Sequence, residues 1–510
     1  MSRTLLLVLV LGLASPQARA ATALFSLAVG HNGLPVDAAT SGVGVLNYAD
    51  DDALAVHELA RAVARRSVVL ALPDRTTQAR YPASGETRPP SLVELRRALA
   101  ELSSDIRRAA GAGDEVTVWF FYSGHGQLDS DGRANLTLAD GALSQDVLYN
   151  EVLPALAGGT VHLMIDACHA EALIRPRDVT AETVEVSASD VASASLRGRL
   201  AHLPNVGAIM ASASNTQAHE WDEYQTGVFT HELLSGLRGG ADVNGDGRVE
   251  YSEIAAFLAA ANRKVTDPRA RLTTLVVAPK LYPRIAIVDT RSARTVAHLQ
   301  GRTHHLGRFQ VEDQRGNRLL DLRTEFNFTV DVVVPAGEPL LVSNDSGEAT
   351  IIPRVDQPTR LEDLVLEKGR LRSRGVMAES MRRGLFAAEF GPSYYGGFVD
   401  SADKQMIPVD LSAAAVRAVA GGSPRGGHNP AAWSAFAVAG ASVVTAGVFA
   451  ALAGRAYSDF QNADFERQSI DARDRYHRYG AVALSAAAVG VLSGALGYWL
   501  WNRDNAHSGM

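Results

Sequence analysis

The sequence predicts an α/β fold with a mostly parallel sheet that helices cover on both faces. Apolar runs without clean alternation, such as ALFSLAVG over 23–30 and EVTVWFFY over 115–122, are typical of strands buried on both sides. Segments with helical spacing separate these runs, which is the order expected of parallel strands joined by crossover helices. The chain has 510 residues, so we expect two or more domains rather than one core.

Residues 1–20 have the pattern of a signal peptide. Arg3 precedes an apolar run over 5–13 that is too short to span a membrane, and the sequence ARA at 18–20 fits a small-x-small cleavage site. This pattern predicts that the chain is exported. The alternative is that residues 1–20 form a buried core segment.

The elements of the first domain follow in order up to residue 280. Helices are predicted at 49–66 and 91–112, where leucines recur on one face, and strands at 160–165 and 206–211. We assign residues 22–280 to this domain.

The pattern changes after residue 280. Alternating runs at 308–311, 328–334 and 338–342, separated by turns with Gly and Asn, predict a small antiparallel β domain over 281–370. Residues 371–428 contain paired glycines and are typical of a linker or juxtamembrane region.

Two apolar stretches without charges, 431–454 and 479–501, are each longer than the roughly 20 residues that cross a bilayer. Aromatic residues lie near their ends, and Ala and Gly allow close packing, so we expect a C-terminal transmembrane helical hairpin. The alternative is a pair of buried core helices. With an exported N-terminus, the first domain would be extracytoplasmic (periplasmic in an organism with two membranes) and anchored in the inner membrane.

The net charge of −7 is modest for this length, and no basic block is present. Nucleic acid is therefore not an expected partner. Nothing in the sequence calls for an organic cofactor.

Two polar motifs directly follow predicted strands. SGHG at 123–126 contains His125, and DACH at 166–169 contains Cys168, the one cysteine of the chain. Because the carboxyl ends of neighbouring parallel strands meet at one edge, we expect a thiol nucleophile beside an imidazole base. Gly126 would let the backbone approach a substrate, and its N–H, with that of Cys168, would hold an oxyanion. The alternative for the cysteine is a buried core thiol.

These motifs resemble those of caspase-like cysteine peptidases of the metacaspase and bacterial orthocaspase type. LNYADDDA at 46–53 and GVFTHELLSGLRG at 227–239 resemble further segments of that family, and the resemblance covers residues 22–265. It implies a caspase-like three-layer sandwich and an endopeptidase with a catalytic dyad of Cys168 and His125.

The resemblance also implies a specificity pocket. Asp166, two residues before the cysteine, and Asp52 match the acids that surround the side chain preceding the cut, and carboxylates there favour Arg or Lys. The expected partner is thus a protein or peptide with a basic residue at the cut. The alternative for the acidic run at 50–52 is a solvated helix start.

The stretch 171–204 is long and contains four arginines, which favours a self-cleavage linker. Where the family usually has Ser-Gly after Cys-His, this chain has Ala170-Glu171. Two alternatives to an active peptidase are therefore an inactive caspase-fold binding platform anchored in the membrane and a thiol enzyme acting on a non-peptide acyl group.

The sequence DVNGDGRVEYSE at 242–253 fits an EF-hand-like calcium loop with a turn at Gly247. A single loop favours a structural or modulatory Ca²⁺, and the alternative is an acidic surface turn. The expected ligands are side-chain oxygens of Asp242, Asn244, Asp246 and Glu253, with the backbone carbonyl of Arg248. Other histidines, His31 among them, show no partner pattern.

Overall fold

The computed structural model describes residues 22–34, 44–82, 85, 87–130, 132–174, 199–212, 220–221, 225–265, 272–368 and 384–405. The predicted signal peptide and both predicted transmembrane stretches lie outside these residues. None of the helices formed by the described residues combines the length and apolar character needed to cross a bilayer. The described residues up to Val399 belong to one compact unit, and those from Asp400 belong to a second.

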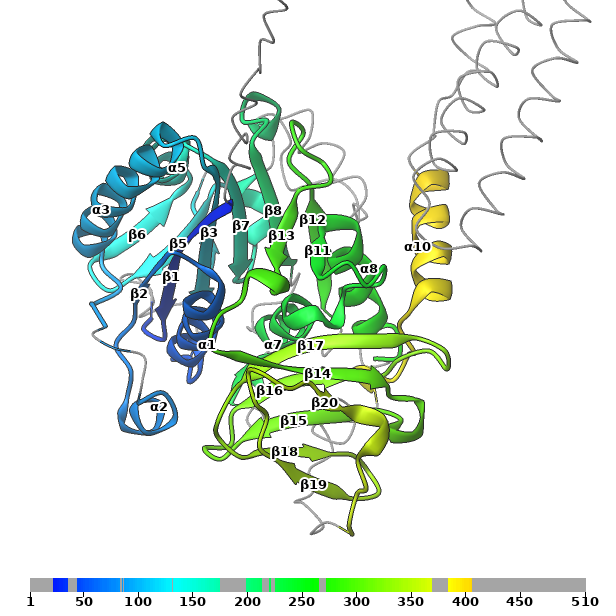
Figure 1. Ribbon diagram of the computed structural model, residues 1–510. Coiled ribbons are helices and arrows are strands. Elements are labelled where there is room, and N and C mark those ends of the chain that lie inside the picture. The colour runs from blue at the N-terminus through cyan, green and yellow to red at the C-terminus, as the bar shows by residue number, and fades with distance from the viewer. Residues whose placement is uncertain are drawn as a thin grey trace, which may run out of the picture. The chain divides into compact units, whose positions relative to one another are not determined.

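A six-stranded sheet forms the centre of the first domain, with the order β12-β8-β7-β3-β1-β2 (Figure 1). All neighbouring pairs are parallel except β12 with β8, so the predicted mostly parallel sheet is confirmed. The strands are β1 (Thr22–His31), β2 (Arg66–Leu70), β3 (Glu115–Gly124), β7 (Thr160–Asp166), β8 (Val206–Ser212) and β12 (Thr273–Val277).

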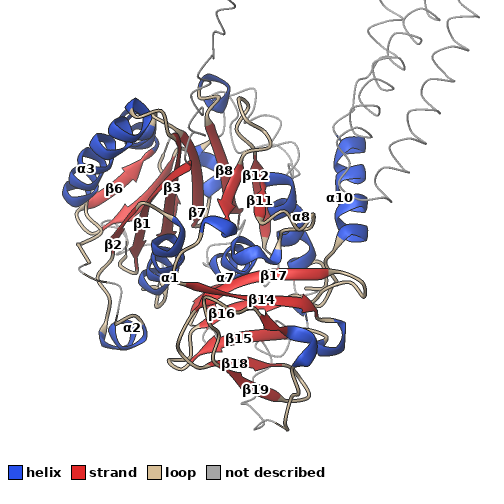
Figure 2. Cartoon of the chain, viewed as in Figure 1, coloured by secondary structure: helices blue, strands red, loops and turns tan. Residues whose placement is uncertain are grey.

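Helices cover both faces of this sheet (Figure 2). Side chains alternate along β3, so Trp119 and Phe121 join one buried apolar cluster while Phe120 and Tyr122 join another. Helices α1 (Ala49–Val63), α7 (Val228–Ser235) and α8 (Tyr251–Asn262) contribute to the first cluster, and α3 (Leu92–Gly111) and α5 (Leu153–Leu156) to the second. The result is the three-layer arrangement that the sequence predicts.

Helix α1 is shorter than predicted. It ends at Val63 because Ala64 is extended, with ψ 153°. Helix α3 agrees with its prediction and begins after Ser91, whose side chain accepts a hydrogen bond from the amide of Glu94.

Several short elements decorate the sheet. Their segments are too short for periodicity to identify, and the sequence did not predict them. They are α2 (Arg75–Arg80), β4 (Gly126–Leu128), β5 (Ala134–Leu138), β6 (Gly141–Ser144), α4 (Gln145–Val147), a π-helix (Leu148–Val152), 3₁₀ turns (Ala170–Leu173 and Arg199–His202), β9 (Glu220–Trp221), β10 (Thr226–Gly227), a π-helix (Gly236–Gly240) and β11 (Arg248–Glu250).

The segment from 296 to 360, here called the β region, forms two small sheets, with orders β17-β14-β20 and β16-β15-β18-β19. Their pairs are antiparallel except β14 with β20. Phe309 and Val332 of this region share a buried cluster with Phe257 of α8, so the β region extends the core of the first domain. The described elements from residue 286 onward, within the β region and around it, are β13 (Ala286–Asp289), 3₁₀ (Thr290–Ser292), β14 (Val296–Arg302), 3₁₀ (His304–Leu306), β15 (Phe309–Asp313), β16 (Arg318–Leu322), β17 (Thr329–Pro335), β18 (Leu340–Ser343), β19 (Glu348–Ile351), β20 (Thr359–Arg360), 3₁₀ (Leu361–Asp363) and α10 (Pro392–Gln405).

Candidate active site

The register between β3 and β7 brings the two sequence motifs to one edge of the sheet. Ser123 pairs with Asp166 at the end of the ladder, and His125 and Cys168 each follow two residues later. Gly126 lies against the turn that holds the cysteine, since a Cβ atom placed on it would be 2.0 Å from the carbonyl oxygen of Cys168. A glycine is thus required here by Cys168 itself, and not only by the approach of a substrate.

Cys168 lies in a sharp turn between β7 and a 3₁₀ turn. The next residue, His169, has φ 58°, a left-handed conformation that residues other than glycine adopt uncommonly. Backbone strain of this kind persists where the surroundings hold it, and it often marks a functional position. Both Cys168 and His125 are buried.

The His125 ring is oriented by a backbone carbonyl. Its Nε2 lies 3.0 Å from the carbonyl oxygen of Gly44. Because a carbonyl only accepts, Nε2 carries the proton in this arrangement and the lone pair of the neutral ring is on Nδ1. Burial lowers the pKa of His125, and the bond to Gly44 opposes that shift only in part. The ring is therefore suited to accept a proton near neutral pH. No sequence motif pointed to a role for Gly44.

The loop that carries His125 is fixed by β5. The Tyr122 hydroxyl lies 2.8 Å from the carbonyl oxygen of Thr137 and 3.0 Å from that of His125. The amide of Thr137 in turn donates to the carbonyl of His125 at 2.9 Å. The imidazole therefore projects from a rigid support.

Asp52 accepts hydrogen bonds from three donors, one on β3 and two on β10. Its Oδ2 accepts from the Ser123 hydroxyl at 2.8 Å, and its Oδ1 accepts from the Thr226 hydroxyl at 2.5 Å and the Gly227 amide at 2.8 Å. Burial, followed by the negative charge of Asp166, raises the pKa of Asp52 well above its ordinary value. The carboxylate is fixed in place but electrostatically strained.

Asp166 lies at the start of α7. Its Oδ2 accepts from the Thr230 hydroxyl at 2.7 Å and the Thr230 amide at 3.2 Å, so the positive end of the helix faces the carboxylate. A Cβ atom on Gly227 would be 2.6 Å from the Oδ2 atom of Asp166 and 2.8 Å from that of Asp52. The structure therefore brings the two predicted pocket acids together around Gly227.

The acidic run at the start of α1 is not solvated, and that interpretation of it is wrong. Asp50, Asp51 and Asp52 are only 1%, 3% and 2% exposed. Asp50 accepts from the Asn32 side chain at 2.7 Å, and Asp51 pairs with Arg80 at 2.8 Å. Burial raises the pKa of Asp50 and that of Asp51, the latter to about 7 despite the positive charge of Arg80. Tertiary contacts enclose the whole run.

His31 also belongs to this edge of the sheet, although sequence reasoning assigned it no role. It ends β1 and pairs in register with Gly124, the residue before His125. Burial, and then the nearby His125, lowers the pKa of His31. The one signal in the sequence was that His31 directly follows the apolar run at 23–30. The pairing of β1 with β3 is what brings it to this edge.

The loop 242–253 is ordered by bonds to its own backbone. Asp242 accepts from the amides of Gly245, Asp246 and Gly247 at 2.8, 3.2 and 2.8 Å. Glu253 accepts from the amides of Val243 and Glu250 at 3.1 and 2.8 Å. Among the described residues, no three His, Cys, Asp or Glu side chains are already gathered as a metal cluster.

The chemistry of this loop nevertheless fits a hard cation. Gly247 has φ 76°, as the sharp turn requires, and the side-chain oxygens of Asn244 and Asp246 accept from amides within the loop. Burial raises the pKa of Asp242 to about 6 and that of Glu253 to about 8. Two buried acids at the ends of one oxygen-rich loop would be stabilised by a divalent cation.

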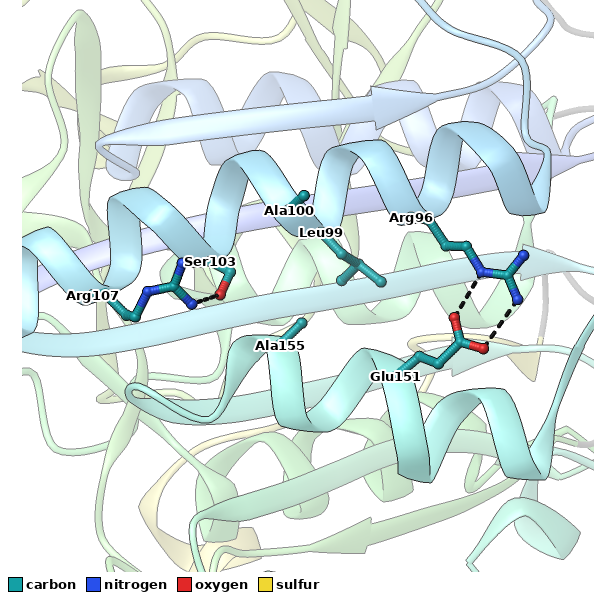
Figure 3. A pocket seen from close by; sticks show the side chains of 7 residues that line it. All are labelled: Arg96, Leu99, Ala100, Ser103, Arg107, Glu151 and Ala155. Carbon is teal, nitrogen blue, oxygen red and sulfur yellow. Dashed lines mark hydrogen bonds and ion pairs between the residues drawn. The ribbon is translucent and has the colours of Figure 1, made fainter.

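A groove of about 360 Å³ lies elsewhere, beside α3 (Figure 3). Leu99 and Ala155 line it, and Arg96 pairs with Glu151 through bonds of 2.7 and 3.0 Å at one end. None of the site residues described above lines this groove.

Residues 44–287 match the protein family described as the caspase domain, and this range includes both the His125 and Cys168 motifs. No curated protein matches the chain significantly. A crystal structure of protein GSU0716 from Geobacter sulfurreducens is 20% identical and covers 52% of this chain and 98% of its own, with a TM-score of 0.29. The structure of pro-sf-caspase-1 is 13% identical and covers 48% of this chain and 81% of its own, with a TM-score of 0.25.

The contact between Gly126 and Cys168 predicts that Gly126→Ala alters the reactivity of the thiol. The added methyl group must displace the Cys168 main chain, so we expect the rate of alkylation by iodoacetamide to change by about tenfold or more. Since Cys168 is the only cysteine, labelling reports on this thiol alone. Gly111→Ala is the control, because a Cβ atom there meets nothing within 4 Å. Equal alkylation rates for both variants would contradict the assigned contact.

Proposed function

We propose that the protein is a cysteine endopeptidase that cleaves after Arg or Lys. The match of residues 44–287 to the caspase domain, a family of cysteine peptidases, supports the peptidase activity. In this proposal Cys168 is the nucleophile and His125 is the base. The Gly44 carbonyl is the third group, which orients the imidazole as such sites require.

The proposed reaction has two halves. The thiolate of Cys168 attacks the scissile carbonyl carbon, and the amides of Gly126 and Cys168 stabilise the oxyanion that forms. Collapse of this intermediate breaks the C–N bond, and the imidazolium of His125 gives its proton to the leaving amine. Water, deprotonated by His125, then hydrolyses the thioester and restores the thiol.

The observation that carries the specificity is the buried acid pair. Asp52 and Asp166 both approach Gly227, and burial together with the charge on Asp166 raises the pKa of Asp52. Two like charges in a low-dielectric site repel each other, and a guanidinium or ammonium group placed between them would remove that repulsion. A flat guanidinium would also match two carboxylates with its several N–H donors.

We expect Asp52→Asn to lower kcat/KM for a fluorogenic Arg-ended peptide by about a hundredfold, because one charge of the pocket is lost. Asparagine can keep all three hydrogen bonds, with its Oδ1 accepting from Thr226 and Gly227 and its amide donating to Ser123. The melting temperature should therefore not fall. In the wild type, kcat/KM should decline on acidification at a pH well above the ordinary pKa of Asp, since protonation of Asp52 removes the same charge.

Asp50→Asn is the matched control, since it makes the same change in the same acidic run and should leave kcat/KM essentially unchanged. Cys168→Ala gives the background rate of peptide hydrolysis without the proposed nucleophile. Similar losses for Asp50→Asn and Asp52→Asn would contradict a basic-residue pocket. Absence of wild-type activity in a folded protein would favour the inactive binding platform instead.

Self-processing is part of the proposal. Cys168 and His125 are both buried, which is consistent with a closed form that needs an activating step. A cut after an arginine within 171–204 would supply it, and proteolytic activation is a common switch.

We therefore expect the purified wild-type chain to yield two fragments whose junction lies in 171–204, while Cys168→Ala stays intact. N-terminal sequencing of the fragments identifies the cut. Fragments formed equally by Cys168→Ala would assign the cleavage to another protease.

We also propose that the loop 242–253 binds Ca²⁺ through Asp242, Asn244, Asp246, Glu253 and the carbonyl of Arg248. The ion would supply positive charge to buried acids. Binding at a calcium concentration a hundred times Kd would stabilise the fold by about 2.7 kcal/mol.

The expected result is a rise in melting temperature of several degrees on adding calcium to chelator-treated protein, and its absence in Glu253→Gln. Glu115→Gln is the control, because Glu115 is exposed and lies outside the loop. A calcium-dependent shift that survives in Glu253→Gln would remove this loop as the binding site.

A further inference from the structure

A polar contact joins the β region to the neighbourhood of the acid pocket. Asn317, in the turn between β15 and β16, accepts a hydrogen bond from Arg80 Nε at 2.8 Å. Its Nδ2 also donates to the backbone carbonyl of Arg80 at 3.0 Å. Both residues are buried. One side chain thus fixes both the main chain and the guanidinium of Arg80.

The guanidinium of Arg80 also contacts two segments that surround Asp52. Its Nη1 donates to Asp51 Oδ1 at 2.8 Å and to the carbonyl oxygen of Gln225 at 3.0 Å. Asp51 precedes Asp52 in α1, and Gln225 precedes Thr226. Arg80 therefore connects the two segments that form the Asp52 environment.

The Gln225 turn is conformationally unusual. Gln225 has φ 52°, a left-handed conformation that costs free energy in a residue other than glycine. Its amide donates to Trp221 at 2.8 Å, and its carbonyl accepts from Arg80. The next two residues supply the Thr226 hydroxyl and Gly227 amide that hold Asp52. A change in this turn would move two of the three donors to that carboxylate.

We propose that Asn317 is a positioning residue for the acidic pocket, which through Arg80 fixes the turn at 225–227 that holds Asp52. This inference rests on the proposed function, since it assigns the β region a part in specificity. Asn317 is uncharged, so it acts on the geometry of the pocket and not on its net charge.

The residue type agrees with this role. Asn317 Nδ2 also donates to Asp313 Oδ2 at 2.8 Å, so the side chain both donates and accepts. An aspartate would accept from Arg80 but would leave the Arg80 carbonyl without this donor and would repel Asp313.

Asn317→Ala in the full chain tests the proposal by two measurements. Loss of the bonds to Arg80 should speed hydrogen exchange at the amides of Gln225 and Gly227 by about fivefold, and should raise KM for an Arg-ended peptide by a similar factor with kcat retained. If Asn317 contributed only to stability, the melting temperature would fall but KM would not rise with kcat retained.

Asn344→Ala is the matched control. Asn344 lies in the turn between β18 and β19 of the same sheet, accepts from the amides of Ser346 and Gly347, and donates to the carbonyl of Leu306. It should leave exchange at 225–227 and KM unchanged.

Equal exchange at 225–227 in the two variants would overturn the inference. Hydrogen exchange can be measured without turnover. An inactive wild type would therefore count against the peptidase proposal alone, and the exchange rates would still decide the role of Asn317. If Asn317→Ala does not fold, Asn317→Asp keeps the acceptor for Arg80 Nε but loses the donor to the Arg80 carbonyl, and should give the same faster exchange. Unchanged exchange in that variant would also overturn the inference.

Discussion

The parallel register between β3 and β7 is the constraint on which the candidate site depends. It aligns Ser123 with Asp166, so the two loops that follow, with His125 and Cys168, leave the sheet at one edge. The register is itself fixed by burial on both faces, since Trp119 and Phe121 fill one core while Phe120 and Tyr122 fill the other. A slip of one residue would exchange these faces and separate the dyad.

Two buried carboxylates, Asp52 and Asp166, lie close together around Gly227. Asp52 and Asp166 are close enough for repulsion to raise the pKa of Asp52. Hydroxyl and amide donors from Ser123, Thr226, Gly227 and Thr230 hold the carboxylates but do not neutralise them.

The β region is bound to the first domain by both apolar and polar contacts. Val332 shares a core with α8, and the Asn317 side chain accepts from Arg80 Nε at 2.8 Å and donates to the Arg80 carbonyl at 3.0 Å. Through Asn317, the same region reaches Arg80 and hence the surroundings of Asp52. These contacts join segments beyond residue 280 to the surroundings of Asp52.

The sequence alone determined the features that are local. Strand 115–122 and the motifs that follow strands are encoded over a few residues, so the sheet and the placement of the His125 and Cys168 motifs at one edge of it could be predicted. Only the tertiary structure decided that Asp50, Asp51 and Asp52 are buried, and that His31 lies near His125. The contact of Asn317 with Arg80 spans 237 positions. Burial and pairing of this kind depend on how distant segments pack, and no local pattern records that.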